Sequence, residues 1–536
     1  WIPIVDDPFV ASYPNAPPAF YQTFVRADPE RTFTRVYVTL WDPRQVQLRI
    51  QAGTREPESS TGQRGAGTIP RDEPTLRHLV GAFNGGFQAL HGEFGMMAEG
   101  RVYLPPKPWA ATVAVFDDGR VGMGSWPAPD WQGRFYDERL ANRQIPEDMV
   151  DMRQNLTSVV EDAEWNPWRR WWWGAAPREA DEQTFTTRSG LCLTSEGFFA
   201  YFWGNGLGPE ALGAAMSSAR CARGIHLDMN SAHCGFELFR TIPPGEEAAP
   251  RERRRSESEP EGPLPEARGW RVRARRAVRS MARAFPRYTG HDGRDFFYLT
   301  LRPVLPGPAL SGATEGEGTF STRGLPHAGW PHAFARTSLG REDARTWVVR
   351  IDPRRAVPAP LQRDERRPLA FLTMPPTQGS LALVARRSSI GWTFAIGEAR
   401  AGDRVIVAGG PVTAESVAAR GVDRDGFLVY VEREAGAGPI SDALERAGAA
   451  GGVELGESRL AFAVGDEGVG PDGFVPREVT PSSSMAWLAR DRPASEVLWP
   501  DNEPRPYSEW GYLQGQRVRY FPEGPPRFAR PPGAGE

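Results

Sequence analysis

The chain has 536 residues, more than one hydrophobic core usually holds, so we expect two domains. Its formal net charge of -3 lacks the positive excess that is typical of nucleic-acid-binding proteins, which argues against a nucleic-acid partner. The sequence contains no run of about 18 apolar residues, so no transmembrane helix is predicted. The first residue is Trp1 rather than a methionine, which indicates a processed N-terminus.

Short strand-like runs recur along most of the chain. The clearest run covers residues 33–51 and has the period of two that half-buried strands show. Further strands are predicted at 111–116, 191–203, 296–303, 346–351, 380–385, 404–408 and 427–432. The best helical patterns are at 75–80, 209–221 and 439–448. This mixture indicates an α+β fold that is built mainly from antiparallel sheets with few helices.

The region from 241 to 290 differs in composition from the rest. Residues 241–268 are rich in Pro, Glu, Arg and Ser and cannot bury a core, so they predict a linker. Over residues 270–287, apolar side chains are spaced among arginines, which predicts a basic amphipathic helix that packs on its own domain or lies on a membrane or glycan. We expect one domain over 1–305, with 241–290 as an excursion, and a second over 306–536.

The two halves contain similar sequences in the same order. The run Gly197–Phe202 resembles Gly426–Val431, and in each half a Gly-Pro turn, a predicted helix and a second strand follow. The first copy ends on Asp228, whereas the second ends on Gly456. We interpret the second half as a degenerate copy without a site; chance similarity between two β-turn-α-β units is the alternative.

The first candidate site is the sequence Asn84-Gly85-Gly86, which follows an apolar strand and precedes His91. Glycines supply the positive φ that a sharp turn needs, and they let a ligand approach backbone N–H groups closely. An ordinary hairpin turn would explain the same residues.

The second candidate site begins where an apolar strand ends at Asp228, with Asn230, His233 and Glu237 soon after it. Carboxylates, an amide and an imidazole at one strand end can supply a general acid or base and hydrogen bonds to a ligand. The alternative is a polar turn that closes the strand, with His233 in solvent. The density of functional groups favours a site.

In their order, these motifs resemble the phosphodiester glycosidase family, the uncovering-enzyme-like domain. The positions that carry the resemblance are Asn84–Phe87, Gly95–Val102, Thr187–Gly190, Gly197, Gly206–Ala219 and Leu227–Asp228. The resemblance covers residues 20–240, and Asp295–Leu299 is similar to a returning strand of that domain. It implies hydrolysis of a bond between a sugar and a phosphodiester. One departure is that Met229–His233 follows Asp228 where the family has a glycine run and a serine.

The resemblance and the two clusters together predict the residues that bind substrate. Asn84 and the backbone of Gly85 and Gly86 would line one side of the site. His91 and Asn230 are further candidates, because their side chains can donate hydrogen bonds in place of a glycine-rich backbone.

Four residues are predicted to be catalytic. Arg188 would bind a phosphate or carboxylate with its planar guanidinium group. Asp228 would orient or protonate the substrate, and His233 and Glu237 are alternative acid–base groups. Which of the three acts as the base is left open.

Tryptophans are concentrated at Trp165, Trp168 and Trp171–Trp173. Indole faces stack on sugar rings, although a single tryptophan is usually buried in a core. Three consecutive residues of a strand cannot all point inward, so at least one should face outward or into the site. Trp172 is therefore a further candidate for substrate binding.

Three cysteines allow one disulfide and one free thiol. Cys192 lies in a predicted strand and Cys221 ends the helix expected to cover that sheet, so we predict a Cys192–Cys221 disulfide, with Cys221–Cys234 as the alternative. The spacing does not fit a zinc site, and no cofactor is expected; a divalent cation on Asp228 is left open.

The leading hypothesis is an exported bacterial hydrolase that acts on a glycosyl phosphodiester or a related glycan bond. The alternative is a non-catalytic cell-envelope or extracellular protein that retains the fold for carbohydrate binding or assembly. Both predict a glycan or sugar-phosphate ligand and a secreted, periplasmic or cell-surface location; the second also predicts an envelope or assembly partner.

Overall fold

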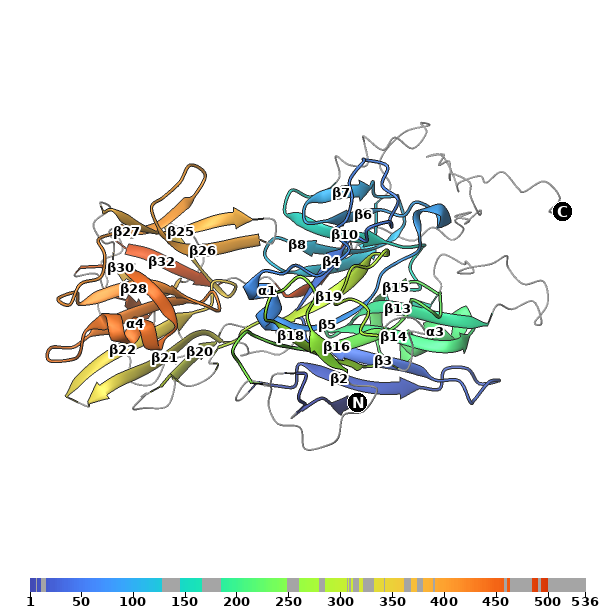
Figure 1. Ribbon diagram of the computed structural model, residues 1–536, viewed down its shortest axis with the longest axis horizontal. Coiled ribbons are helices and arrows are strands. Elements are labelled where there is room, and N and C mark those ends of the chain that lie inside the picture. The colour runs from blue at the N-terminus through green and yellow to red at the C-terminus, as the bar shows by residue number, and fades with distance from the viewer. Residues whose placement is uncertain are drawn as a thin grey trace. The chain divides into compact units, whose positions relative to one another are not determined.

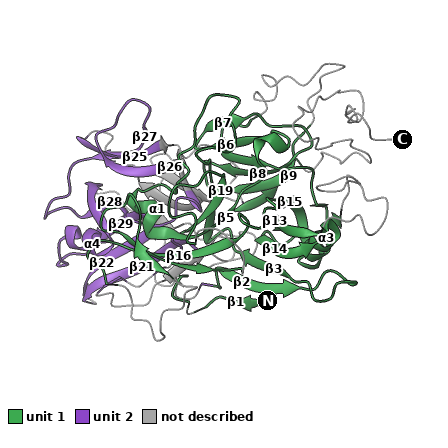
Figure 2. Ribbon diagram, turned by 45° about the vertical axis from the view of Figure 1, so that its right-hand side comes forward, with its two compact units in different colours: residues 1–12, 17–302, 494–536 green, residues 13–16, 303–493 purple. Residues whose placement is uncertain are grey.

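The structure, a computed structural model, contains two compact units (Figure 2). Unit 1 comprises Trp1–Ser12, Pro17–Arg302 and Ala494–Glu536, and unit 2 comprises Tyr13–Ala16 and Pro303–Pro493. The residues that the structure describes are 1–5, 7–10, 16–127, 145–165, 185–247, 260–278, 285–305, 307, 310–311, 318–321, 332–341, 343–360, 368–373, 379–388, 391–456, 460–462, 484–489 and 493–499.

The described residues of unit 1 form three sheets (Figure 1). The first has the order β1 (Ile2–Pro3), β2 (Phe20–Val25), β3 (Val36–Trp41), β14 (Phe199–Leu207), β13 (Thr186–Thr194), β15 (Cys221–His226), β11 (Val160–Glu161) and β12 (Glu164–Trp165). The second has the order β17 (Glu261–Pro263), β18 (Arg271–Arg276), β16 (Phe236–Ile242), β5 (Leu79–Asn84), β19 (Phe296–Leu301) and β4 (Val46–Gln51). The third has the order β33 (Ser495–Val497), β9 (Val121–Ser125), β8 (Ala111–Phe116), β10 (Met149–Gln154), β6 (Met96–Ala98) and β7 (Arg101–Leu104).

Unit 1 also contains two short α-helices in its described part, α1 (Glu73–His78) and α3 (Pro209–Ser218). Asp72 caps α1, because its side chain accepts a hydrogen bond from the N–H of Thr75 at 2.9 Å. Pro209 begins α3, where its missing N–H has no cost. Arg220, with a φ of 60°, follows the end of that helix.

The central strands of the first sheet, β3, β14, β13 and β15, are buried on both faces. One face packs on α3 and contributes Val38 and Cys192 to a cluster with Leu212 and Met216 of the helix. The other face joins the largest core cluster together with side chains of the second and third sheets, among them Leu191, Tyr201, Ile225, Phe83, Phe236, Phe297 and Val113. The strand ends of this sheet are therefore held rigidly from both sides.

The predicted disulfide between Cys192 and Cys221 is confirmed, with the two Cα atoms 5.8 Å apart. It joins β13 to the start of β15, directly beneath α3. Cys234, the alternative partner, is a buried free thiol. The structure describes no helix that is long and apolar enough to cross a membrane.

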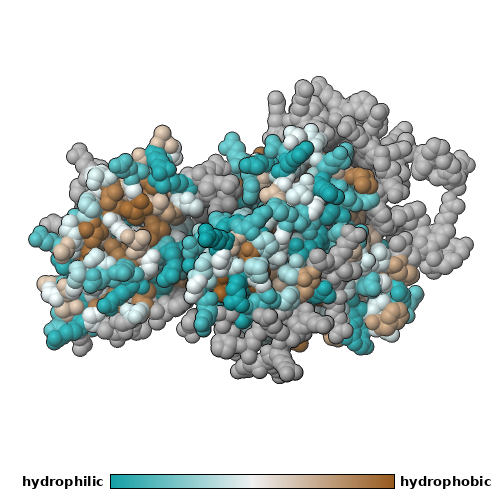
Figure 3. Space-filling view, viewed as in Figure 1, coloured by the Kyte–Doolittle hydropathy of each residue, from teal (hydrophilic) through white to brown (hydrophobic). Residues whose placement is uncertain are grey.

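The described residues of unit 2 form three further sheets and the helix α4 (Ile440–Arg446). The first has the order β20 (Gly318–Ser321), β21 (His332–Arg341), β22 (Ala344–Ile351), β29 (Leu428–Arg433), β28 (Ala418–Asp423) and β30 (Ala449–Glu454). The second has the order β23 (Ala356–Pro360), β32 (Ser484–Ala489), β24 (Pro368–Thr373) and β31 (Leu460–Phe462). The third has the order β26 (Gly391–Gly397), β25 (Leu381–Ser388) and β27 (Arg404–Gly409). Apolar side chains gather on one face near β25 and β27 (Figure 3), where Val405 is 49% exposed.

The strands of unit 2 are connected in an order that also occurs in unit 1. The segment β28–β29–α4–β30 has the sheet order β29-β28-β30, and β13–β14–α3–β15 has the order β14-β13-β15. The order β23-β32-β24-β31 matches β4-β19-β5-β16, and β26-β25-β27 matches β9-β8-β10. Each match preserves the sequence order of the strands.

Among the described strand pairs, all are antiparallel except β33 with β9. The prediction of mainly antiparallel sheets with few helices is therefore confirmed. The alternating run 33–51 forms β3 and β4, which lie in different sheets. The strand predicted at 191–203 is instead a hairpin of β13 and β14, with Gly197 in its turn at a φ of 90°.

The basic helix predicted over 270–287 is wrong. Arg271–Arg276 forms β18, which pairs with β16 and β17. Val272 and Ala274 are buried on one face while arginines alternate with them, which is the pattern of a strand. The excursion 241–290 thus contributes two strands to a sheet of unit 1. The expected domain 306–536 also differs from the units, since β33 pairs with β9 of unit 1.

Candidate functional site

The two sequence clusters meet in unit 1 where β5 ends, β15 ends and β19 begins. The N–H of Asp228 donates to the carbonyl of Gly85 at 3.0 Å, and the N–H of Gly85 donates to the carbonyl of Asp295 at 3.1 Å. Because β15 belongs to the first sheet and β5 pairs with β19 in the second, these bonds tie the ends of two sheets together.

The side chain of Asn84 is buried, and all of its hydrogen-bonding capacity is used within the chain. Nδ2 donates to Ser189 Oγ at 2.9 Å and to the carbonyl of Gly85 at 3.1 Å. Oδ1 accepts hydrogen bonds from the Tyr201 hydroxyl at 2.7 Å and from the N–H of Gly235 at 3.2 Å. An amide offers two donor hydrogens and two acceptor lone pairs, so Asn84 holds neighbouring strands together. Its role in substrate binding stays a prediction.

Gly85 and Gly86 lie against a buried ion pair between Arg153 and Asp295. Arg153 Nε donates to Asp295 Oδ2 at 2.7 Å, and the N–H of Gly86 donates to the same oxygen at 3.1 Å. A Cβ atom on Gly85 would lie 1.9 Å from Asp295 Oδ2, and one on Gly86 would lie 2.8 Å from Arg153 Cζ. Neither glycine has a positive φ. Close packing, rather than a sharp turn, therefore requires glycine here.

Asp228 is almost completely buried, with 8% of its surface exposed. Oδ1 accepts hydrogen bonds from the N–H groups of Met229 at 2.8 Å and Asn230 at 3.2 Å. Oδ2 accepts a hydrogen bond from Arg294 Nη2 at 3.0 Å. Burial raises the pKa of the Asp228 carboxyl, and the charge of Arg294 and the two backbone bonds limit that rise. Such a carboxyl can exchange a proton at a higher pH than an exposed aspartate.

Arg188 and His226 form a second buried group beside the turn that follows Asp228. Arg188 Nε donates to the carbonyl of Leu207 at 3.0 Å, and Nη1 lies 3.3 Å from His226 Nε2 and 3.8 Å from Met229 Sδ. Burial lowers the pKa of Arg188 to about 10. Burial and the charge of Arg188 hold the pKa of His226 well below its ordinary value, which favours the neutral imidazole.

Asn230 and His233 lie in the turn between Asp228 and β16. Asn230 is exposed, and its Oδ1 accepts a hydrogen bond from the N–H of Ala232 at 2.9 Å. The carbonyl of His233 accepts a hydrogen bond from Arg287 Nη1. Among the predicted site residues that the structure describes, Asn230 is thus the most open to a ligand.

Glu237 lies on β16 and is completely buried. Its two carboxylate oxygens lie 2.9 Å and 3.1 Å from the backbone nitrogen of Arg287, which donates to both. Burial raises the pKa of Glu237 to about 8, against the lowering effect of these backbone bonds. The guanidinium of Arg287 forms an ion pair with Asp292, from Nε to Oδ2 at 2.5 Å. Arg287 therefore links Glu237 to the carbonyl of His233.

His91 ends a single turn of 3-10 helix, Ala89–His91, and is partly buried. Its ring centroid lies 6.0 Å from that of Phe87. Burial and the positive charge of Arg294 lower the pKa of His91, while Glu56 opposes them. Arg294 thus acts electrostatically on both His91 and Asp228.

Trp172 lies outside the described residues, as do Trp168 and the other tryptophans of that run. Among the residues that the structure does describe, no three His, Cys, Asp or Glu side chains are grouped to hold a metal ion.

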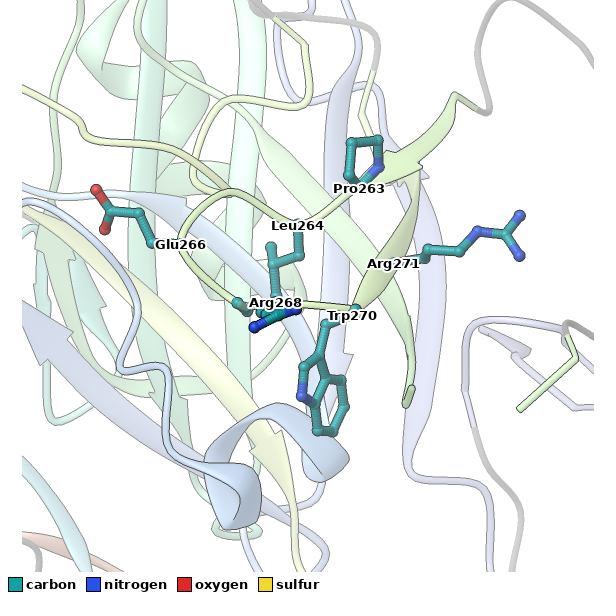
Figure 4. A pocket seen from close by; sticks show the side chains of 8 residues that line it. Pro263, Leu264, Glu266, Arg268, Trp270 and Arg271 are labelled. Atoms are coloured by element: carbon teal, nitrogen blue, oxygen red, sulfur yellow. The ribbon is translucent and has the colours of Figure 1, made fainter. Parts of the chain in front are cut away.

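A surface pocket of about 480 Å³ lies away from these residues in the sequence, at the turn between β17 and β18. It is lined by Pro263, Leu264, Glu266, Ala267, Arg268, Gly269, Trp270 and Arg271 (Figure 4). Trp270 points toward α1, where the Arg77 guanidinium lies 6.0 Å from its ring. A single hairpin builds this pocket, and none of the predicted site residues lines it.

Four charged residues at this place were missed by the sequence analysis: Arg153, Arg287, Arg294 and Asp295. Arg294 and Asp295 directly precede an apolar strand that the sequence does predict, so a charged pair at a strand start was a usable signal. Arg153 lies on β10, whose buried residues also include Asp151. Charged residues at alternate positions of an apolar strand indicate buried ion pairs.

The sequence matches no protein-family model and no curated protein. Among solved structures, the chain is similar to the zebrafish N-acetylglucosamine-1-phosphodiester alpha-N-acetylglucosaminidase catalytic domain, auto-inhibited by its pro-peptide, with 12% identity over 42% of this chain and 76% of that chain and a TM-score of 0.28. A hypothetical protein from Synechocystis is similar with 10% identity over 54% of this chain and 64% of that chain, and a TM-score of 0.27. At such low TM-scores, a function has to be inferred from the chain's own residues.

Proposed function

We propose that unit 1 is a hydrolase of a glycosyl phosphodiester or a related glycan bond, in an exported protein. The observation that carries the proposal is the Asp228–Arg294 pair, in which a buried carboxyl lies 3.0 Å from a cation at the meeting point of two sheets. Two interactions support it further: the charge of Arg294 acts on His91, and Arg287 hydrogen-bonds to both Glu237 and the carbonyl of His233. The Cys192–Cys221 disulfide supports export, because disulfides persist in oxidising compartments.

The proposed reaction needs an acid or orienting carboxyl, an anion site and a base. The oxygen of water forms a bond to the anomeric carbon, and the bond from that carbon to the phosphate oxygen breaks with its electron pair on the phosphate. Asp228 orients or protonates the departing oxygen, and an imidazole of His91 or His233 accepts the proton from water. A guanidinium group stabilises the charge on the phosphate.

A second candidate function is carbohydrate binding or assembly without catalysis. It is favoured by the hydrogen bonds that already occupy the predicted ligand groups, namely the amide of Asn84, the N–H groups of Gly85 and Gly86, and both oxygens of Asp228. A site saturated by its own chain has fewer groups for a substrate.

We also propose that unit 2 is a degenerate copy of unit 1 without the site. The matching strand orders support this, and so does the pairing of equivalent residues. In unit 1, Arg188 of β13 lies opposite Gly204 of β14. At the equivalent place in unit 2, the carbonyl of Val417 accepts a hydrogen bond from the N–H of Arg433. By the same register Asp228 corresponds to Gly456. The two halves would then share a fold and differ in chemistry.

Turnover of a chromogenic glycosyl phosphodiester by the full chain tests the hydrolase proposal. We expect release of the chromophore in proportion to enzyme concentration. If no turnover occurs while glycan binding is detected by titration calorimetry, the binding function replaces the hydrolase.

A further inference from the structure

Arg294 is bound less completely than the two other guanidinium groups of the site. Arg153 and Arg287 each hold a carboxylate with both Nε and Nη2, the two-pronged geometry that suits carboxylates. Arg294 instead makes one bond to Asp228, from Nη2 to Oδ2 at 3.0 Å. The other oxygen of Asp228 accepts two backbone N–H groups. Arg294 therefore keeps donors that Asp228 does not use.

One of these donors is shielded and unpaired. The Nε atom of Arg294 is buried and has no hydrogen-bond partner within the residues that the structure describes. A buried N–H group is normally paired with protein, water or a ligand. The side chain as a whole is 12% exposed, whereas Arg188 has no exposed surface. An oxygen of a small anion beside Asp228 would satisfy this donor.

Arg188, the arginine predicted from the sequence, is placed differently. It has no exposed surface, and its Nε donates to the carbonyl of Leu207. Its Nη1 lies against His226 and Met229. Its Nε and Nη1 are thus already in contact with groups of the chain itself, so Arg188 is better suited to positioning the strand end.

We propose that Arg294, rather than Arg188, binds the phosphate group of the substrate. The inference rests on the proposed function and deepens it, since it identifies the cation that recognises the phosphodiester. A phosphate bound to Arg294 would bring its negative charge next to the carboxyl of Asp228. That charge favours the protonated form of the carboxyl. One residue would therefore both hold the phosphate and keep a proton on the acid beside it.

Titration calorimetry of the full chain with inorganic phosphate tests this directly. We expect Arg294→Gln to weaken phosphate binding at least about tenfold, because charge-assisted hydrogen bonds are lost. Arg294→Lys should be intermediate, since an ammonium group keeps the charge but not the fork. The matched control is Arg55→Gln. Arg55 is exposed, and its N–H donates to the carbonyl of Gly293 at 3.2 Å, so its loss removes a charge nearby.

The inference is overturned if the wild type does not bind phosphate, if Arg294→Gln binds it normally, or if Arg55→Gln weakens binding equally. The double variant Asp228→Asn/Arg294→Gln removes both charges of the pair, and its phosphate binding should also be weak. The double variant replaces Arg294→Gln as the test if that single variant does not fold, because the double variant leaves no buried carboxylate unpaired.

Steady-state kinetics separates this inference from the proposed function. If phosphate binding depends on Arg294 but no glycosyl phosphodiester is turned over, the anion site is supported and the proposed hydrolase function is wrong. Turnover with an unchanged KM and unchanged phosphate inhibition in Arg294→Gln leaves the hydrolase and removes this inference.

Discussion

At the scale of single residues, the carboxyl of Asp228 is subject to two opposing effects. Burial disfavours its charged form, while Arg294 and two backbone N–H groups favour it. Asparagine keeps the shape and an acceptor oxygen but cannot carry a proton to the substrate. We expect Asp228→Asn to lower kcat by about 10² to 10⁴, the usual contribution of a general acid or base, while the protein stays folded.

The measurement is turnover of a glycosyl phosphodiester together with a thermal melt of both proteins. Loss of turnover with a retained cooperative melt supports the acid role. A rate equal to that of the wild type would remove Asp228 from the mechanism and leave it as a residue that stabilises a turn, which asparagine does equally well.

Glu237 gives the stability of the protein a specific pH dependence. Its pKa is about 8 in the folded state against an ordinary value of 4.5, so the folded state binds the proton more tightly than the unfolded state. Its stabilising contribution is complete below about pH 4.5 and is lost as the pH rises from there through about 8, by on the order of 5 kcal/mol. Glu237→Gln has no proton to lose, so its Tm should fall less between pH 5 and pH 9.

Melting curves of the two proteins at several pH values check this. The comparison isolates Glu237, because other buried carboxyls titrate in both proteins. Parallel curves across the whole range would show that the Glu237 carboxyl is not protonated in the folded protein at neutral pH.

At the scale of elements, the end of β5 is fixed by contacts that leave no room for a side chain. A Cβ atom on Gly85 would overlap Asp295 Oδ2, whereas one on Gly290 has no heavy atom within 4 Å. We expect Gly85→Ala to lower the free energy of unfolding by about 1–3 kcal/mol, as overpacking of a core does. Gly290→Ala should be nearly neutral, and chemical denaturation of both variants measures the difference. Equal, small effects would show that the Arg153–Asp295 pair can move aside.

The strands were predictable because each carries its pattern locally. Residues 111–116 are a short, almost entirely apolar run and form β8 with the predicted bounds. A local signal was also present in Arg271–Arg275, where Val272 and Ala274 alternate with arginines, but apolar residues further along suggested a helix. A period of two over five residues is the stronger local evidence for a strand.

The candidate site was only half predictable, because half of its partners come from distant segments. Asp228 was found from its position at a strand end. Its partner Arg294 lies 66 residues away and has no periodic signal. Likewise Arg153 meets Asp295 across 142 residues. Such pairs depend on how sheets assemble, which no short sequence window contains.

At the scale of the whole molecule, two units share an order of strands but differ in the residues at equivalent strand ends. Unit 1 has Asp228 after the strand that follows its helix, and unit 2 has Gly456 there. Unit 1 has the buried Arg188 on β13, and the equivalent position before β28 is Val417, which is 37% exposed. The two positions compared, those of Asp228 and Arg188, thus carry charged side chains in unit 1 and uncharged residues in unit 2.

This difference predicts that substitutions at equivalent positions have unequal effects. Arg188→Met keeps much of the side-chain volume but removes the hydrogen bond to Leu207 and the contact with His226. We expect it to lower kcat with little change in KM, because Arg188 positions the strand end while Arg294 holds the phosphate. Its stability should fall by about 1 kcal/mol, the value of one hydrogen bond. Val417→Ala should alter neither turnover nor, beyond about 0.5 kcal/mol, stability, as is usual for surface positions.

Steady-state kinetics and denaturation of the two variants, prepared in the same full-length chain, make the comparison. A fall in kcat that is confined to Arg188→Met assigns the chemistry to unit 1, since the equivalent change in unit 2 leaves it intact. A similar fall in Val417→Ala would mean that unit 2 takes part in the reaction, and its description as a copy without a site would then be wrong. A rise in KM with unchanged kcat in Arg188→Met would instead show that Arg188 binds the phosphate, because the loss of ground-state binding raises KM.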